Sequence, residues 1–167
     1  MSLELFHAIL FYAFGGVAVG AALVMVTQRN PTYSAFALIV TLVSLAGVFG
    51  LLGSTFIAVL QIVVYAGAIM VLFLFVLMLL NVRAEVRPPG EGRVFKLVAL
   101  ALGAVLAGEV GSVLMAVRTP VAGAFDASAR QVAHLLFDPR YLYVFEATSI
   151  LILASLVGAI ALAKRDP

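Results

Sequence analysis

Residues 61–80 read QIVVYAGAIMVLFLFVLMLL, an apolar stretch whose only polar side chains are those of Gln61 and Tyr65. A hydrocarbon layer about 30 Å thick requires about 20 apolar residues in a helix that rises about 1.5 Å per residue. If this helix begins at Thr55, Tyr65 lies roughly 15 Å along it, near the middle of the bilayer. A phenol at that depth requires a hydrogen-bond partner on another helix or a trapped water molecule. Gln61, four residues earlier, places a second polar group on the same face.

The composition of the whole chain indicates an integral membrane protein. Of its 167 residues, 65% are hydrophobic and 11% are charged, and the mean hydropathy is +1.22. Soluble domains contain about 45–50% apolar and about 25% charged residues. No segment between the apolar runs is long enough for a folded soluble domain. The N-terminal residues are acidic rather than basic and the apolar run behind them is long, so we expect no signal peptide.

Redox, metal and nucleic-acid chemistry is not expected of this chain. Cysteine is absent, which excludes disulfides, thiolate metal sites and iron–sulfur ligation by its residues. The two histidines, His7 and His134, fall near the ends of apolar runs, where a buried bis-histidine haem is not expected. No glycine-rich phosphate loop follows a predicted strand, and the basic residues form no patch for nucleic acid. We therefore predict no catalytic, cofactor-binding or metal-binding residues.

Five apolar runs are long enough to cross a membrane, which predicts an all-α integral membrane bundle in a single domain, residues 1–167. Asn30 and Pro31 end the first helix and begin the second. Only Gly53 and Ser54 separate the second from the third, with a serine or threonine positioned to cap the third. The predicted transmembrane helices are residues 5–27, 33–52, 55–80, 94–117 and 142–163.

The basic residues predict the orientation of this bundle. Seven of the ten lie at one end of the alternating spans and three at the other. The positive-inside rule places the larger group in the cytoplasm. We therefore expect the N-terminus outside and the C-terminus in the cytoplasm. The larger group comprises Arg29, Arg83, Arg87, Arg93, Lys96, Lys164 and Arg165, and the smaller group Arg118, Arg130 and Arg140.

The loop before the fifth span contains a further helical pattern. Residues 128–137 predict a short amphipathic helix at the membrane interface, with Asp126 or Ser128 as its N-cap. Its apolar face carries Val132, Leu135 and Leu136.

Small residues recur at four-residue spacing in several spans, which allows close approach of helices from this chain and from other subunits. We expect both kinds of packing, because five helices with short loops cannot cover this many small faces alone. The pairs and triplets are Gly16/Gly20, Ala46/Gly50, Gly103/Ala107/Gly111 and Ala154/Gly158.

Two carboxylates fall inside predicted spans. Glu109 lies about 12 residues beyond Lys96, or roughly 18 Å into the fourth helix. A carboxylate at that depth must be protonated, paired or hydrated. It fits either a proton relay or a structural hydrogen bond to a neighbour, and we favour the hydrogen bond. Glu146 lies near the outer end of the fifth helix among aromatic residues, where an interfacial carboxylate near a helix N-terminus is favoured over direct proton transfer.

Two segments of the chain resemble a known family. Residues 61–78, preceded by Asn30-Pro31 and Phe56, contain the motif Tyr-x-Gly-Ala that begins at Tyr65. Residues 145–162 begin Phe-Glu and continue as a long apolar helix. Both resemble the membrane subunit J of bacterial NADH:quinone oxidoreductase, the family of mitochondrial NADH dehydrogenase subunit 6. The resemblance extends over all five spans and is most specific in the third and fifth.

The resemblance implies a place in respiratory complex I, where NADH oxidation and quinone reduction are coupled to proton pumping. The chain would lie in the bacterial inner membrane, near the quinone-reducing end of the membrane arm, beside subunits resembling A, H, K and N. It would bind no redox cofactor itself, since NADH, FMN, iron–sulfur clusters and quinone are handled by partner subunits.

The resemblance also implies that the third helix changes locally from α to π near Tyr65 and Gly67, opening or closing a hydrated path. Single-turn π-bulges are frequent at functional sites. Gly67 is a natural weak point because it lacks a Cβ and has a low helix propensity. Such a shift would move Met70 and Phe73 into or out of the path.

Three other functions remain open on the sequence. A stand-alone channel or transporter usually requires a chain of ionisable groups across the bilayer, which this sequence lacks. A purely structural spacer would need neither Tyr65 nor Gly67 for activity once the complex has assembled. A membrane subunit of a related hydrogenase-type or plastid-type assembly would have the same shape and a different electron donor.

Overall fold

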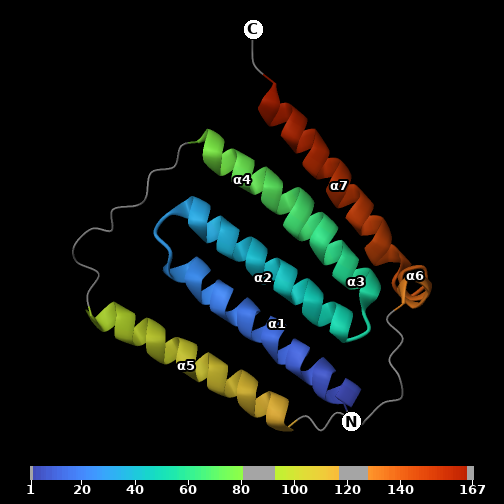
Figure 1. Cartoon of the computed structure of the whole chain (residues 1–167). Coiled ribbons are helices and arrows are strands. Elements are labelled where there is room, and N and C mark those ends of the chain that lie inside the picture. The colour runs from blue at the N-terminus through green and yellow to red at the C-terminus, as the bar shows by residue number, and fades with distance from the viewer. Residues whose placement is uncertain (1, 81–92, 117–127, 165–167) are drawn as a thin grey trace.

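The computed structural model describes residues 2–80, 93–116 and 128–164. Within these ranges, five helices are long and apolar enough to cross a membrane, which confirms the predicted all-α class (Figure 1). The first two are α1 (Ser2–Thr27) and α2 (Pro31–Leu51), and the last two are α5 (Arg93–Ala116) and α7 (Leu142–Ala163).

The third span is one rod in three parts: α3 (Thr55–Leu60), the π-helix η1 (Gln61–Ile69) and α4 (Met70–Leu79). Helical backbone angles continue across both junctions, since Gln61 has φ −59° and ψ −41° and Met70 has φ −71° and ψ −34°. The third span is therefore a single continuous helix with a wider central turn.

Local sequence signals define the turn between α1 and α2. The side chain of Asn30 accepts a hydrogen bond from the backbone N–H of Thr32 at 3.0 Å, and Pro31 occupies the first turn of α2. The Ser34 hydroxyl donates to the carbonyl of Met25 at 2.8 Å, which ties the start of α2 to the end of α1. The prediction that Asn30 and Pro31 begin the second helix is confirmed, with α2 starting two residues earlier than expected.

The turn between α2 and α3 is a Schellman motif. Gly53 has φ +79°, and its N–H bonds to the carbonyl of Gly50 while the N–H of Ser54 bonds to that of Phe49. Ser54 precedes α3, but its side chain makes no capping hydrogen bond. The predicted serine cap is therefore wrong at Ser54, because the backbone of the Schellman turn, rather than a side chain, makes the hydrogen bonds of this connection.

The core consists of small side chains between three helices. α2 lies between α1 and the α3–η1–α4 rod (Figure 1), and four of its residues are buried. Close approach of helices through small residues is the usual mode of packing in membranes, where lipid is as apolar as the side chains. The buried residues of the described ranges are Ala18, Ala35, Ala37, Ser44, Ala46, Ala58, Ala66 and Met70.

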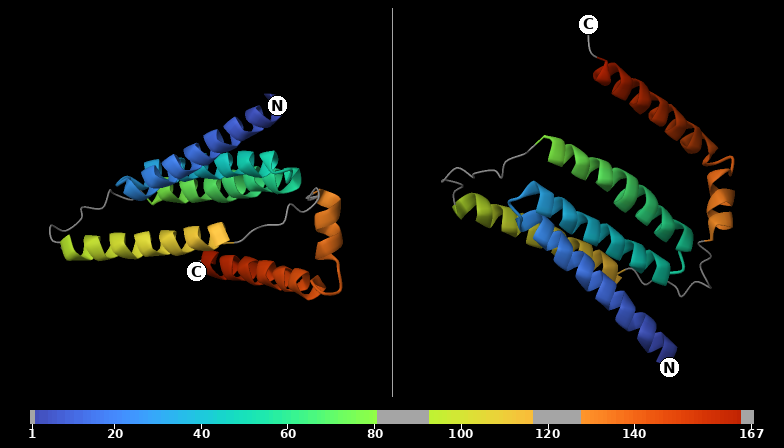
Figure 2. Two further views of the ribbon diagram at one scale, coloured as in Figure 1. Left: turned by 90° about the horizontal axis from the view of Figure 1, so that it is seen from below. Right: turned by 45° about the horizontal axis from the view of Figure 1, so that its top comes forward.

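The helices α5 and α7 lie apart from this three-helix unit. Neither has extensive contacts with another described helix, and none of the residues in the membrane-spanning stretch of either is buried. Both are visibly separated from the three-helix unit in Figure 2. Their apolar surfaces are thus open to helices outside this chain.

Between them, α6 (Ala129–Leu136) crosses the end of the bundle at a steep angle to the long helices (Figure 2). The side chain of Ser128 accepts a hydrogen bond from the N–H of Gln131 at 3.4 Å, which confirms Ser128 as the N-cap. The alternative cap, Asp126, lies outside the described residues.

Candidate functional site

The π-helix η1 lies at the centre of the third span and contains both Tyr65 and Gly67. Its widened turn is seen directly in the bond from the Met70 N–H to the carbonyl of Tyr65, five residues earlier. Gly67 also fits the narrow space there, because a Cβ on it would lie 3.2 Å from the carbonyl oxygen of Ile62. A side chain at this position would press on the backbone of the π turn.

The spacing between buried side chains along this helix lengthens by one residue within η1. Before it, the less exposed residues recur at helical spacing and end at Gln61; after it, they resume at Ala66, five residues later. α2 is the main helix outside the rod that α3, η1 and α4 contact, so both series face α2. The residues in these series are Ser54, Ile57, Ala58 and Gln61, then Ala66, Gly67, Met70, Leu74 and Leu77.

The extra residue in the π turn is what keeps both halves of the helix on α2. From Ala58 to Met70 an α-helix would turn about 1200°, which is about a third of a turn beyond three full turns. A π turn holds more residues, so each advances the helix through a smaller angle. Ala58, Ala66 and Met70 can then all face α2, and they are 9%, 9% and 4% exposed.

The candidate residues of the third helix divide between two faces. Met70 is buried on the α2 side, and Gln61 and Gly67 are half-buried. Tyr65 is 51% exposed, and no hydrogen bond of its hydroxyl is found within the described part of the chain. The described residues therefore do not supply the hydrogen-bond partner that a phenol within a membrane span requires.

Phe73 lies beyond η1 and is 47% exposed. It lines a small pocket of about 240 Å³ where the α1–α2 turn meets α4, together with Met25, Pro31, Ser34, Ala35, Leu38 and Leu77. This pocket is mostly apolar and contains no charged group.

The two candidate carboxylates are not brought to the third helix by this chain's own packing. Glu109 lies on α5 and Glu146 on α7, and both side chains are exposed. No hydrogen bond or ion pair of the Glu109 carboxylate is found within the described ranges, and its backbone carbonyl accepts from the Ser112 hydroxyl at 2.8 Å. The structural partner favoured for Glu109 is thus not provided by the described residues.

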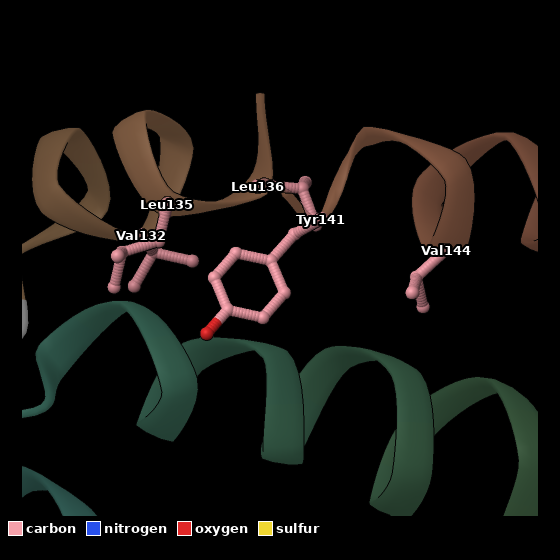
Figure 3. Close-up of a pocket in the computed structure, with 5 residues that line it drawn as sticks. All are labelled: Val132, Leu135, Leu136, Tyr141 and Val144. Atoms are coloured by element: carbon pink, nitrogen blue, oxygen red, sulfur yellow. The ribbon is translucent and has the colours of Figure 1, made fainter. Parts of the chain in front are cut away.

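An apolar pocket is formed by α6 and the start of α7. It has a volume of about 340 Å³ and is lined by the predicted apolar face of α6 together with Tyr141 and Val144. Figure 3 shows the Tyr141 hydroxyl directed toward the helix of the third span and away from α7. Phe137 and Phe145 close the corner between α6 and α7 with an edge-to-face contact, ring centroids 5.1 Å apart.

Ala66 and the pair Phe14 and Gly47 were missed as important positions by sequence reasoning. A Cβ on Gly47 of α2 would lie 2.8 Å from two carbons of the Phe14 ring of α1, so the ring packs directly against the backbone of α2. The sequence shows Ala66 and Gly47 as small residues among large ones, but in an almost wholly apolar helix this pattern does not reveal which face of the helix is buried.

Across the described ranges, no three histidine or acidic side chains gather to hold a metal ion.

These features define a class: a multi-pass membrane protein with a three-helix unit, two laterally open helices and a π-helix in the middle of its third span. The family described as NADH-ubiquinone/plastoquinone oxidoreductase chain 6 matches residues 21–162. The chain belongs to this family, which confirms the resemblance found in the third and fifth spans.

Individual relatives agree with this assignment. Over 93% of its length the chain is 42% identical to NADH-quinone oxidoreductase subunit J of Pseudomonas aeruginosa, covering 96% of that protein. It is 37% identical to subunit J of Rhodobacter capsulatus, covering 80% of it. It is also 35% identical to NAD(P)H-quinone oxidoreductase chain 6 of Leptolyngbya boryana, covering 79% of that chain.

Proposed function

We propose that this chain is the J-type membrane subunit of a proton-pumping NADH:quinone oxidoreductase and that its third helix is a gate for protons. The observation that supports a gate is the π-helix at Gln61–Ile69, in the middle of the third span of a chain of this family. The subunit itself takes no part in electron transfer. NADH, FMN, iron–sulfur clusters and quinone are bound by partner subunits, since a chain without cysteine offers no thiolates for a cluster.

The gate works through two registers of one helix. In the π register, Tyr65 points away from α2, toward the surface that partner subunits cover. Conversion to an α register rotates one half of the helix against the other by about 100°, the turn of one residue. Met70 and Phe73 then move relative to Tyr65, and a hydrated path that ends at its phenol opens or closes.

The energy difference between the two registers is within reach of such a switch. Lipid and neighbouring helices are as apolar as the Met70 side chain, so rotation loses packing contacts and little hydrophobic energy. Shifting a two-state helix from 1:99 to 99:1 requires about 5.5 kcal/mol. Charge changes at a nearby quinone site can supply a bias of this size through differential contacts with the two states.

The remaining helices attach the gate to the complex. The open faces of α5 and α7 suit the helices of subunits resembling A, H, K and N. We propose the bacterial inner membrane as the site of assembly, with the N-terminus outside and the C-terminus in the cytoplasm. Glu109 and Glu146 then face these neighbours, where they accept structural hydrogen bonds.

The test uses Tyr65→Phe and Gly67→Val in the assembled complex, with NADH oxidation and proton pumping measured on the same preparation. Tyr65→Phe removes the hydroxyl, and Gly67→Val places a branched side chain against the Ile62 carbonyl of the π turn. We expect fewer protons pumped per electron in both. The matched control is Tyr33→Phe at the start of α2, which should behave as wild type. If both variants keep wild-type rates and stoichiometry, the third helix is scaffold and the proposed gate is wrong.

The same measurements separate the other candidate functions. A spacer predicts impaired assembly of the variants with normal activity of the complexes that do form. A stand-alone channel predicts ion flux when the chain alone is reconstituted in liposomes. A hydrogenase-type or plastid-type assembly would contain a different electron-input module, which mass spectrometry of the co-purifying subunits identifies.

A further inference from the structure

The register of the third helix, α or π, decides which residue lies on the α2 face one turn after Gln61. In an α-helix, the residue four positions later shares the face, and that residue is Tyr65. In the π-helix it is Ala66, five positions later, which is 9% exposed while Tyr65 is 51% exposed. The register therefore decides whether a methyl group or a phenol ring meets α2.

The surface of α2 accepts only the smaller of the two. Every buried residue of α2 is an alanine or a serine, with Ser44 and Ala46 4% and 2% exposed. The helices approach closely enough that a Cβ on Gly50 would lie 4.0 Å from the Cβ of Ala58. A tyrosine ring in the place of the Ala66 methyl would force the third helix away from α2.

We infer that Ala66 sets the register: its contact with α2, supported by Met70 one turn later, holds the third helix in the π form. The packing of this chain alone thus selects the π register. The α form exists only where partner subunits stabilise it, a consequence that rests on the proposed function.

Gly67 is an alternative cause of the π turn. If the low helix propensity of Gly67 produced the π turn, the residues beside it could be exchanged without changing the register. If the α2 contact produces it, the position of the small residue decides. The two causes predict opposite results for one pair of substitutions.

The experiment exchanges the two residues, Tyr65→Ala together with Ala66→Tyr, and leaves Gly67 in place. The small side chain then follows Gln61 by four positions, as an α-helix requires. The variant complex is purified and its structure determined by cryo-electron microscopy. We expect hydrogen bonds to the fourth residue throughout 61–69 and a rotation of Met70 by about 100° off α2.

The matched control exchanges two outward-facing neighbours, Ala68→Ile together with Ile69→Ala. Both are exposed, and the overall composition of the helix is unchanged. This control should keep the π-helix. A π-helix that persists in the Tyr65/Ala66 exchange, with the ring wedged against α2, would overturn the inference.

A deletion provides a second test should the exchange variant not assemble. Removing Val63, which is 60% exposed, leaves Ala66 only four positions after Gln61. The helix should become α-helical with Ala66 and Met70 both still on α2, and a surviving π-helix would contradict the role of Ala66. If the register changes while proton pumping stays normal, the inference stands and the proposed gate fails. If the register does not change, the inference fails whatever the activity.

Discussion

The contact between Phe14 and Gly47 gives the sharpest test of how α1 packs on α2. Gly47→Ala would place a methyl group 2.8 Å from Cδ1 and Cε1 of the Phe14 ring and 2.9 Å from Cγ. Carbon atoms in favourable contact lie about 3.5–4.0 Å apart, so the ring and α2 must separate by roughly 0.7–1.2 Å. Overpacking of this kind costs about 1–3 kcal/mol, and the better helix propensity of alanine offsets about 1 kcal/mol. We expect a net destabilisation of up to about 2 kcal/mol.

Thermal unfolding of the assembled complex in detergent measures this effect. Gly50→Ala is the matched control, because its Cβ would make an ordinary 4.0 Å contact with the Cβ of Ala58. Phe14→Leu in the Gly47→Ala background should restore stability, and the double-mutant cycle isolates the coupling between the two residues. The packing argument is refuted if Gly47→Ala unfolds at the same temperature as Gly50→Ala, or if Phe14→Leu gives no rescue.

Three further predictions concern topology, the turn and the isolated chain. Cysteines introduced near Ser2 and Asp166 should be labelled from opposite sides of the membrane, and labelling of both from one side would exclude five spans. Gly53→Ala should lower stability by about 1–2 kcal/mol because Gly53 has φ +79°, while Gly53→Asn should lower it less; equal melting temperatures for the wild type and Gly53→Ala would contradict this. Expressed alone, the chain should aggregate in detergent, since no residue in the membrane-spanning stretches of α5 and α7 is buried among the described residues, and a monodisperse, heat-stable monomer would argue against an obligate subunit.

Sequence alone identified the features that depend on local chemistry. The five spans follow from length and hydropathy, and the Asn30 cap and the amphipathic α6 follow from patterns within a few residues. The failed cap at Ser54 shows the limit of this approach. Whether a serine caps a helix depends on backbone angles, and the Schellman turn set by Gly53 gives Ser54 φ −92° and ψ 58°, for which no capping bond forms.

The packing of the third helix could not be predicted for a different reason. Nearly every side chain in residues 61–80 is apolar, so the sequence has no polar stripe to mark which face is buried. The five-residue step from Gln61 to Ala66 becomes visible only when burial against α2 is known. For the same reason, the four-residue spacing of small residues in α5 did not reveal that none of them is buried within this chain.

The division of the chain into a three-helix unit and two open helices bears on how a gate could be biased. α2 holds one face of the third helix through Ala58, Ala66 and Met70, and this contact is complete within the chain. Tyr65 lies outside this contact and is 51% exposed. A partner that binds Tyr65 on that face in one register competes with α2 for the orientation of the same helix. In the proposed gate, both contacts act on the same helix, so a change of charge or hydration around the phenol shifts the balance between the two registers directly, without passing through α5 or α7.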